Sequence, residues 1–207
     1  MQMEKDTTVY VYVGEIPARL SMQSVYPKAR QTEIEACKNE RVRQEKYCAW
    51  KLLQYALYDV YGKKMDEYSW TKTNTGKWLT DSAFFSISHT KNVVVVAISA
   101  QTVGVDVEGE SAKLLRVLDK ILSRRESEKF MRLAEREKLS FLLNQWTKKE
   151  AVFKAFGDSG FVPREIETND YSTWTDAIRM SGNEYLLSVA GEFEKVCLRS
   201  VGRYLET

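Results

Sequence analysis

Several short stretches of the chain have an apolar residue at every second position. One is VYVYV, from Val9 to Val13, and another is VGVDV, from Val103 to Val107. A period of two sends alternate side chains to opposite faces, so each stretch is predicted to be a strand with one buried face. The polar HTKN, from His89 to Asn92, is predicted to be the turn between two further strands.

Two longer regions have the spacing of helices. The region from Gln31 to Tyr61 is predicted to be rich in helix, and Gly62 is a plausible end. Its apolar residues at helical spacing are Tyr47, Trp50, Leu53, Leu57 and Val60. In the second half of the chain, SRRE, from Ser123 to Glu126, has the form of a capping box, so a helical run is predicted from there to Gly157.

The two halves of the chain resemble each other in pattern. TVYVYVGE from Thr8 is similar to TVGVDVEGE from Thr102, and WKLLQYALYDVYG from Trp50 is similar to WTKKEAVFKAFG from Trp146. A pair of strands, FFSIS with VVVVAIS, is matched by YLLSV with KVCLRSV from Tyr185. Each half is therefore expected to hold a strand, a long helical region and a hairpin.

This repeat predicts an α+β fold in two similar halves, residues 1–100 and 101–207. Each half is expected to pack its helical region on a small, mainly antiparallel sheet. A cleft between such halves is a natural place for a ligand, so the active site is expected there. Because both halves lie in one chain, a monomer is expected.

Composition narrows the class of protein. The chain has 207 residues, of which 43% are hydrophobic. Its 31 basic residues nearly balance its 29 acidic ones, so the basic excess typical of a nucleic-acid binder is missing. Three scattered cysteines suggest free thiols in a reducing compartment, and a single histidine leaves no Cys/His metal site. No signal peptide or apolar run long enough for a bilayer is evident, so a soluble, cytoplasmic protein without a membrane partner is expected.

Two acidic residues lie in the predicted strand VGVDVE. Asp106 and Glu108 point to the same face, with Cα atoms about 7 Å apart. They repel each other unless a cation lies between them. The alternative is that they form the solvated outer face of an edge strand.

A third acid, Glu150, lies where a buried stripe is expected. In a helix it shares a face with Trp146 and Phe153, and burying an unpaired charge there is costly. A salt bridge to Lys154, one turn on, would explain the pair but not its place on the apolar side.

These acids suggest a metal site if they converge. Asp106, Glu108 and Glu150 would together offer hard oxygen ligands suited to Mg²⁺, which also favours phosphate oxygens. Lys154 would then bring positive charge to the same phosphate.

Other polar segments could contact a phosphate. His89 is the single histidine, and a structural role is the plain alternative; Ser88 and His89 could instead donate hydrogen bonds side by side. In TNTGKW, Gly76 would let backbone approach a ligand and Lys77 would add charge. The mixed charges between residues 28 and 51 suggest a solvated helix face, from which one or two cations could reach a phosphate.

Three of these segments together resemble a known family. FSISHT, VGVDVE and WTKKEAVFKAFG resemble the motifs of the 4′-phosphopantetheinyl transferases, in the longer, surfactin-synthetase-activating type with two similar halves. The third motif matches at every defined position, and the resemblance covers roughly residues 75 to 160. Ser86 stands where the family often has Asn, and Trp78 where it has Pro.

The resemblance implies Mg²⁺-dependent transfer of the phosphopantetheine arm of coenzyme A to a serine of an apo acyl or peptidyl carrier protein, with release of adenosine 3′,5′-bisphosphate. It implies metal binding by Asp106, Glu108 and Glu150, and catalysis by Glu150, as base, and Lys154. Coenzyme A contacts are implied for Thr75, Gly76, Lys77, Ser88, His89 and Lys154, and for Lys28 with Arg30 or Arg43 at the 3′-phosphate. Trp146 is expected to pack and Lys149 to face a phosphate.

Two other functions use the same residues. A Mg²⁺-dependent phosphohydrolase would need no protein acceptor, and a coenzyme A- or carrier-binding module would bind without transferring. Carrier choice is expected to lie in surface contacts, including the stretch between Glu108 and Ser123.

Overall fold

The computed structural model describes residues 7–158, 160–202 and 204–206, which form two compact units. Residues up to 101 and residues from 193 onward make the first unit, and residues 102–192 make the second. The expected halves were 1–100 and 101–207. The segment from residue 193 is grouped with the first unit because its strand pairs there.

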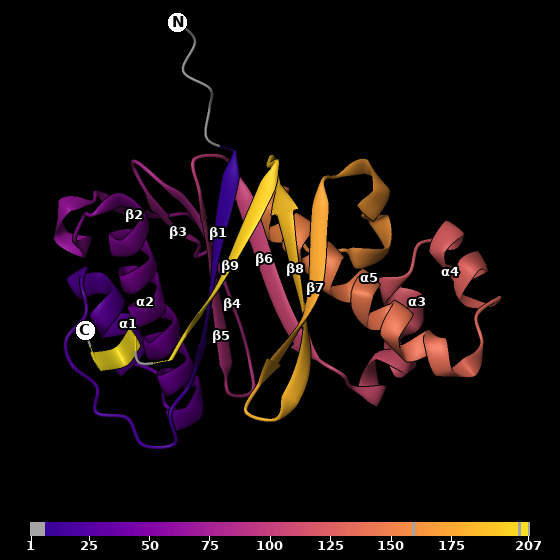
Figure 1. Ribbon diagram of the computed structural model, residues 1–207, viewed down its shortest axis with the longest axis horizontal. Helices are drawn as coiled ribbons and strands as arrows, with labels where there is room; N and C mark the ends of the chain where they lie inside the picture. Colours follow the sequence, from indigo (N-terminus) through magenta and orange to yellow (C-terminus); the bar gives the residue numbers. More distant parts are fainter. Residues whose placement is uncertain (1–6, 159, 203, 207) are drawn as a thin grey trace, which may run out of the picture. The chain divides into compact units, whose positions relative to one another are not determined.

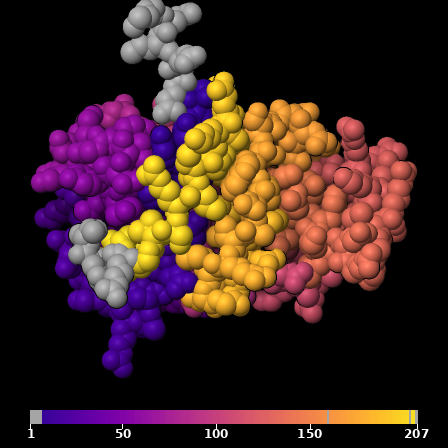
Figure 2. All heavy atoms as spheres, in the orientation of Figure 1, coloured from indigo at the N-terminus to yellow at the C-terminus, as the bar shows by residue number. Residues whose placement is uncertain are grey.

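The first unit has a four-stranded sheet in the order β4-β5-β1-β9 (Figure 1). β1 (Thr8–Glu15) pairs antiparallel with β5 (Val93–Ser99), which pairs antiparallel with β4 (Phe84–Thr90). β9 (Lys195–Val201) lies at the edge, parallel to β1. Its residues are mostly exposed or half-buried, and it is seen at the surface in yellow in Figure 2.

α2 (Glu40–Tyr61) covers this sheet, and α1 (Lys28–Glu35) packs on α2. The two helices are separated by a short break, because the side chain of Asn39 caps α2 by accepting from the Val42 amide. Gly62 ends α2 in the left-handed conformation, as predicted. Between α2 and β4 lie β2 (Trp70–Lys72) and β3 (Trp78–Thr80), whose tryptophans pack on the buried Trp50 at centroid distances of 5.1 and 5.7 Å.

The second unit has a three-stranded antiparallel sheet in the order β6-β8-β7. Its strands are β6 (Val103–Gly109), β7 (Thr173–Met180) and β8 (Asn183–Gly191). The 22-residue α5 (Glu135–Phe156) packs on β6 and β8, and is preceded by α3 (Leu118–Ile121) and α4 (Arg124–Phe130). The predicted capping box is present: Ser123 accepts from the Glu126 amide, and the Glu126 carboxylate accepts from the Ser123 amide.

Short 3₁₀ helices complete the chain, at Met65–Glu67, Ala112–Val117, Pro163–Glu165, Thr168–Asp170 and Tyr204–Glu206. Within the described residues, no helix is both long and apolar enough to cross a bilayer.

The α+β class with mainly antiparallel sheets is confirmed, as is the turn between β4 and β5. The predicted hairpin between Tyr185 and Val201 is wrong. β8 instead forms a hairpin with β7, which precedes it in the chain. β9 pairs with β1 of the first unit. The duplication and the cleft stay predictions.

Candidate active site

β6 and α5 approach each other closely at Gly104. A Cβ atom at this position would lie 2.0 Å from the carbonyl oxygen of Ala151 and 2.6 Å from the amide nitrogen of Ala155. The face of β6 that carries Gly104 therefore faces α5, and Asp106, two residues on, shares that face. The alternative of a solvated outer face is wrong for Asp106, which is only 3% exposed.

The buried carboxylate of Asp106 is met by a lysine from α5. The Lys154 ammonium donates to Oδ1 of Asp106 at 2.6 Å and lies 3.9 Å from Oε2 of Glu150. Lys154 is thus paired with acids from both elements. The salt bridge within the helix is present, but the closer partner of Lys154 is the strand carboxylate.

The pKa of Glu150 is affected by both acids of β6. The pKa of Glu150 is raised to about 7, chiefly by burial; Lys154 lowers this pKa, and the charges of Asp106 and Glu108 add to the rise. Glu150 is therefore in the same electrostatic environment as the two acids of β6.

The described residues contain no group of three or more Asp, Glu, His or Cys side chains already placed to hold a metal ion. The donor chemistry nevertheless suits Mg²⁺, because the three carboxylates offer hard oxygen ligands and their mutual repulsion favours a bound cation. The Lys154 ammonium already supplies one positive charge among them.

The buried face of α5 differs from the expected one. Its positions facing β6 and β8 are small, including Thr147, Ala151 and Ala155, which lets the backbone of the helix come close to the sheet. Trp146 and Phe153 lie half-buried to one side, both against the ring of Phe161, at 5.7 and 4.9 Å. The packing role predicted for Trp146 agrees with this.

The expectation that Lys149 faces a phosphate is wrong. Its side chain is fully buried, and its ammonium donates to Oε2 of Glu126 at 2.6 Å and to the carbonyl oxygen of Pro163 at 3.1 Å. Lys149 therefore ties α5 to the capping box of α4. A lysine beside a motif acid gave no sequence signal for this, because its partner lies 23 residues earlier.

A chain of hydroxyl groups also escaped the sequence interpretation. Ser188 on β8 lies opposite Asp106 in the sheet, and its hydroxyl is 2.8 Å from that of Thr147 and 2.9 Å from that of Thr175. This network links α5, β8 and β7 beside the acids. Thr147 is the second residue of the segment WTKKEAVFKAFG, which was the available signal.

In the first unit, Ser88 and His89 are neighbours on β4, so their side chains point to opposite faces. Ser88 is buried, whereas the His89 side chain is 38% exposed. Their side chains therefore do not lie side by side, and their contact with a phosphate stays a prediction. His89 shares its face with Ile87, which packs against the core beneath α2, and its Nδ1 lies 3.5 Å from Oε2 of Glu45.

The TGK loop forms the exposed turn between β2 and β3. Gly76 adopts a φ of +89°, and its amide donates to the carbonyl oxygen of Thr73 at 2.9 Å. The hydroxyl of Thr75 lies 2.8 Å from that of Thr73, which also accepts from the Lys77 amide. The loop is thus fixed by Thr73, and Lys77 is exposed at its end.

The cations considered for the 3′-phosphate have different surroundings. Lys28 is exposed at the start of α1. Arg43 pairs with Glu40 one turn before it. The guanidinium of Arg30 lies 4.8 Å from the ring centre of Trp50 and binds Glu33 at 3.1 Å, so Arg30 has a clear packing role.

Comparison with known proteins adds independent evidence. Residues 102–200 match the model of the 4′-phosphopantetheinyl transferase superfamily. The resemblance to this superfamily is confirmed. The chain is also similar to a protein named 4′-phosphopantetheinyl transferase gsp, from Aneurinibacillus migulanus, with 28% identity over 113 residues. That match covers 54% of this chain and 48% of the relative, so the chain spans about half the length of the curated relative.

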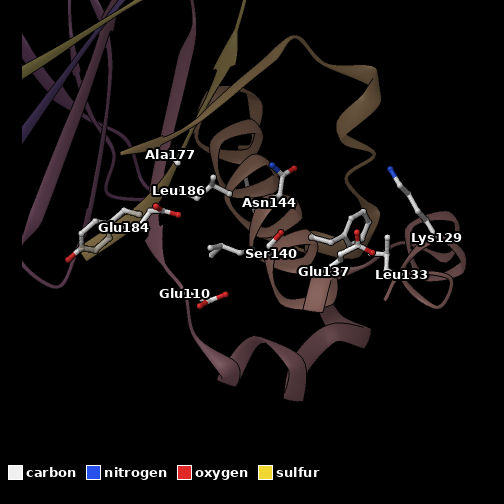
Figure 3. A pocket seen from close by; sticks show the side chains of 12 residues that line it. Glu110, Lys129, Leu133, Glu137, Ser140, Asn144, Ala177, Glu184 and Leu186 are labelled. Atoms are coloured by element: carbon white, nitrogen blue, oxygen red, sulfur yellow. The ribbon is translucent and has the colours of Figure 1, made fainter. Parts of the chain in front are cut away.

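The transferase-like segment also carries a groove outside the acidic cluster (Figure 3). It has a volume of about 740 Å³ and lies between the first half of α5 and one end of the sheet. Figure 3 shows Ser140 and Asn144 on α5 near Leu186 of β8, with Lys129 farther along the groove. Glu110, in the stretch expected to help choose a carrier, also lines it.

Proposed function

We propose that this protein transfers the 4′-phosphopantetheine arm of coenzyme A to a serine of an apo acyl or peptidyl carrier protein. The observation that carries the proposal is the meeting of Asp106, Glu108, Glu150 and Lys154 on β6 and α5, inside the segment that matches the superfamily. These four residues are the ones to which the motifs assign metal binding and catalysis.

The reaction exchanges one P–O bond for another. The serine oxygen bonds to the phosphorus that bears the pantetheine arm, and the pyrophosphate bond to the nucleotide breaks. Adenosine 3′,5′-bisphosphate leaves with the electron pair of that bond. The serine proton must be accepted by a base.

Glu150 is suited to hold that proton. Without a bound cation its pKa is raised to about 7, and it is proposed to accept the proton directly or through a water molecule. Lys154 carries positive charge beside it, which stabilises negative charge as it builds up on the leaving phosphate.

Asp106, Glu108 and Glu150 would hold the proposed Mg²⁺, which when bound neutralises pyrophosphate charge. In the first unit, His89, the buried Ser88 and the loop of Thr75, Gly76 and Lys77 are proposed to contact coenzyme A. Lys28 and Arg43 are proposed for its 3′-phosphate.

The proposal is tested by the intact mass of apo carrier proteins incubated with this protein, coenzyme A and Mg²⁺. A gain of one phosphopantetheine arm is expected, lost with EDTA and in the Asp106→Ala variant. Coenzyme A cleaved without a modified carrier would favour a phosphohydrolase. Coenzyme A bound but intact, with no carrier of either class modified, would favour a binding module.

A further inference from the structure

The single histidine of the chain has a buried carboxylate beside it. The Glu45 side chain is 11% exposed, and its Oε2 lies 3.5 Å from Nδ1 of His89. Its other oxygen, Oε1, accepts from Nε of Arg41 at 3.1 Å. A buried carboxylate is costly unless it is paired, and Glu45 has a cation or potential cation at each oxygen.

A carboxylate at this place is unexpected if phosphate binds nearby. Its negative charge repels a phosphate directly, so a purely local role would weaken binding. Its effect changes sign if it acts through the imidazole. A nearby negative charge favours the protonated form of histidine, and a protonated His89 attracts phosphate.

We propose that Glu45 is a positioning residue that keeps His89 protonated near neutral pH, so that His89 offers a positive charge to a phosphate of coenzyme A. This inference rests on the proposed function for its ligand. The contact between Glu45 and His89 does not depend on it.

The charges around His89 give Glu45 a clear role. The strand segments Phe84–Thr90 and Val93–Ser99 contain no ionisable side chain besides His89. The turn between them carries Lys91, and the first turns of α2 carry the cations Arg41, Arg43 and Lys46 and the acids Glu40 and Glu45. The cations disfavour a proton on His89; Arg41 is bound to Glu45, and Arg43 is bound to Glu40. Glu45 is the acid whose carboxylate lies against the imidazole, and it favours the imidazolium.

The first test follows the His89 ring by NMR as the pH changes. Because the chain has one histidine, its signal needs no assignment. The pKa of His89 is expected to fall by about one unit in the Glu45→Gln variant. The Glu35→Gln variant is the matched control, since Glu35 is an exposed acid at the end of α1, and should leave the titration unchanged. In the Glu45→Asp variant, which keeps the charge, the pKa of His89 should be higher than in Glu45→Gln. An unchanged pKa in Glu45→Gln would overturn the proposal.

The second test measures coenzyme A affinity by calorimetry at about pH 5.5 and about pH 7.5, on either side of the ordinary histidine pKa. At the higher pH, Glu45→Gln should bind roughly three- to tenfold more weakly, because His89 loses its proton. At the lower pH His89 is charged in both proteins, so the variant should bind equally well or more tightly. In a His89→Gln background, removing Glu45 should not weaken binding at either pH.

Equal weakening at both pH values, or weakening in the His89→Gln background, would contradict a role through His89. If His89→Gln alone leaves coenzyme A affinity unchanged, the ligand part of the inference is overturned. Transfer to a carrier in the mass assay would then show that the proposed function survives that failure.

Discussion

At the scale of single residues, Glu150 makes stability depend on pH. Its pKa is raised to about 7 in the folded protein from an ordinary 4.5, so the folded state binds this proton more tightly than the unfolded chain. Stability from this group is fully present below about pH 4.5 and is lost as the pH rises towards 7. In EDTA, the free energy of unfolding of the wild type should fall by on the order of 2 kcal/mol over this pH range, relative to that of the Glu150→Gln variant. Urea unfolding at each pH measures both. Parallel stability curves would contradict the raised pKa.

A substitution of Lys149 tests its buried ion pair with Glu126. Replacing it by Met keeps the volume but leaves the Glu126 carboxylate buried without its cation. We expect a loss of about 3 kcal/mol in the free energy of unfolding. The neighbouring Lys148, which is half-buried, gives the control: Lys148→Met should change stability by less than about 0.5 kcal/mol. If both variants unfold at the same urea concentration, Lys149 does not tie α5 to α4.

At the scale of elements, the contact between β6 and α5 depends on Gly104. In Gly104→Ala, the new Cβ would collide with the backbone of α5, which must move away and carry Glu150 and Lys154 from Asp106. We expect a loss of about 1–3 kcal/mol in unfolding free energy, together with weakened carrier modification.

The control for this substitution is Gly202→Ala. An added Cβ there meets nothing within 4 Å, and the backbone does not require glycine. It should leave stability within about 0.5 kcal/mol of the wild type. A Gly104→Ala protein as stable and active as this control would show that the close approach is not needed.

Local elements were predictable because their signals lie within a few residues. The capping box of Ser123 and the end of α2 at Gly62 each depend on neighbouring backbone groups. The buried face of α5 was not predicted correctly. An apolar pattern favours large residues such as Trp146, whereas close packing of a helix on a sheet needs small ones such as Ala151.

In the candidate site, too, local relations were predictable and contacts between distant segments were not. Asp106 and Glu108 share a face because of strand geometry alone, and Lys154 follows Glu150 by one turn. The family motifs assign Lys154 and Asp106 to one site although they are 48 residues apart, whereas periodicity says nothing about a contact between distant segments. The partner of Lys149 had no local pattern to reveal it.

At the scale of the whole molecule, the last strand is the feature that the sequence pattern misplaced. β9 resembles the second strand of a hairpin, yet it pairs parallel with β1, so that Thr8 lies opposite Lys195. Such a pairing joins two strands from opposite ends of the described chain, and no turn sequence connects them that could have predicted it. Tyr204, only 1% exposed, then packs against Gly14, and Arg199 donates to the Tyr12 hydroxyl at 2.7 Å.

Cutting the chain after Glu192 should therefore weaken the first unit more than the second. The cut removes β9, Arg199 and Tyr204 from β1, while the contacts of α5 with β6 and β8 all lie within residues 102–192. Hydrogen exchange followed by mass spectrometry should show β1 amides exchanging more than about tenfold faster, equivalent to a loss of over about 1.4 kcal/mol. Peptides from α5 and β8 serve as the internal control and should change much less. Equal loss of protection in both units would mean that β9 stabilises the second unit as strongly as the sheet to which it is hydrogen-bonded.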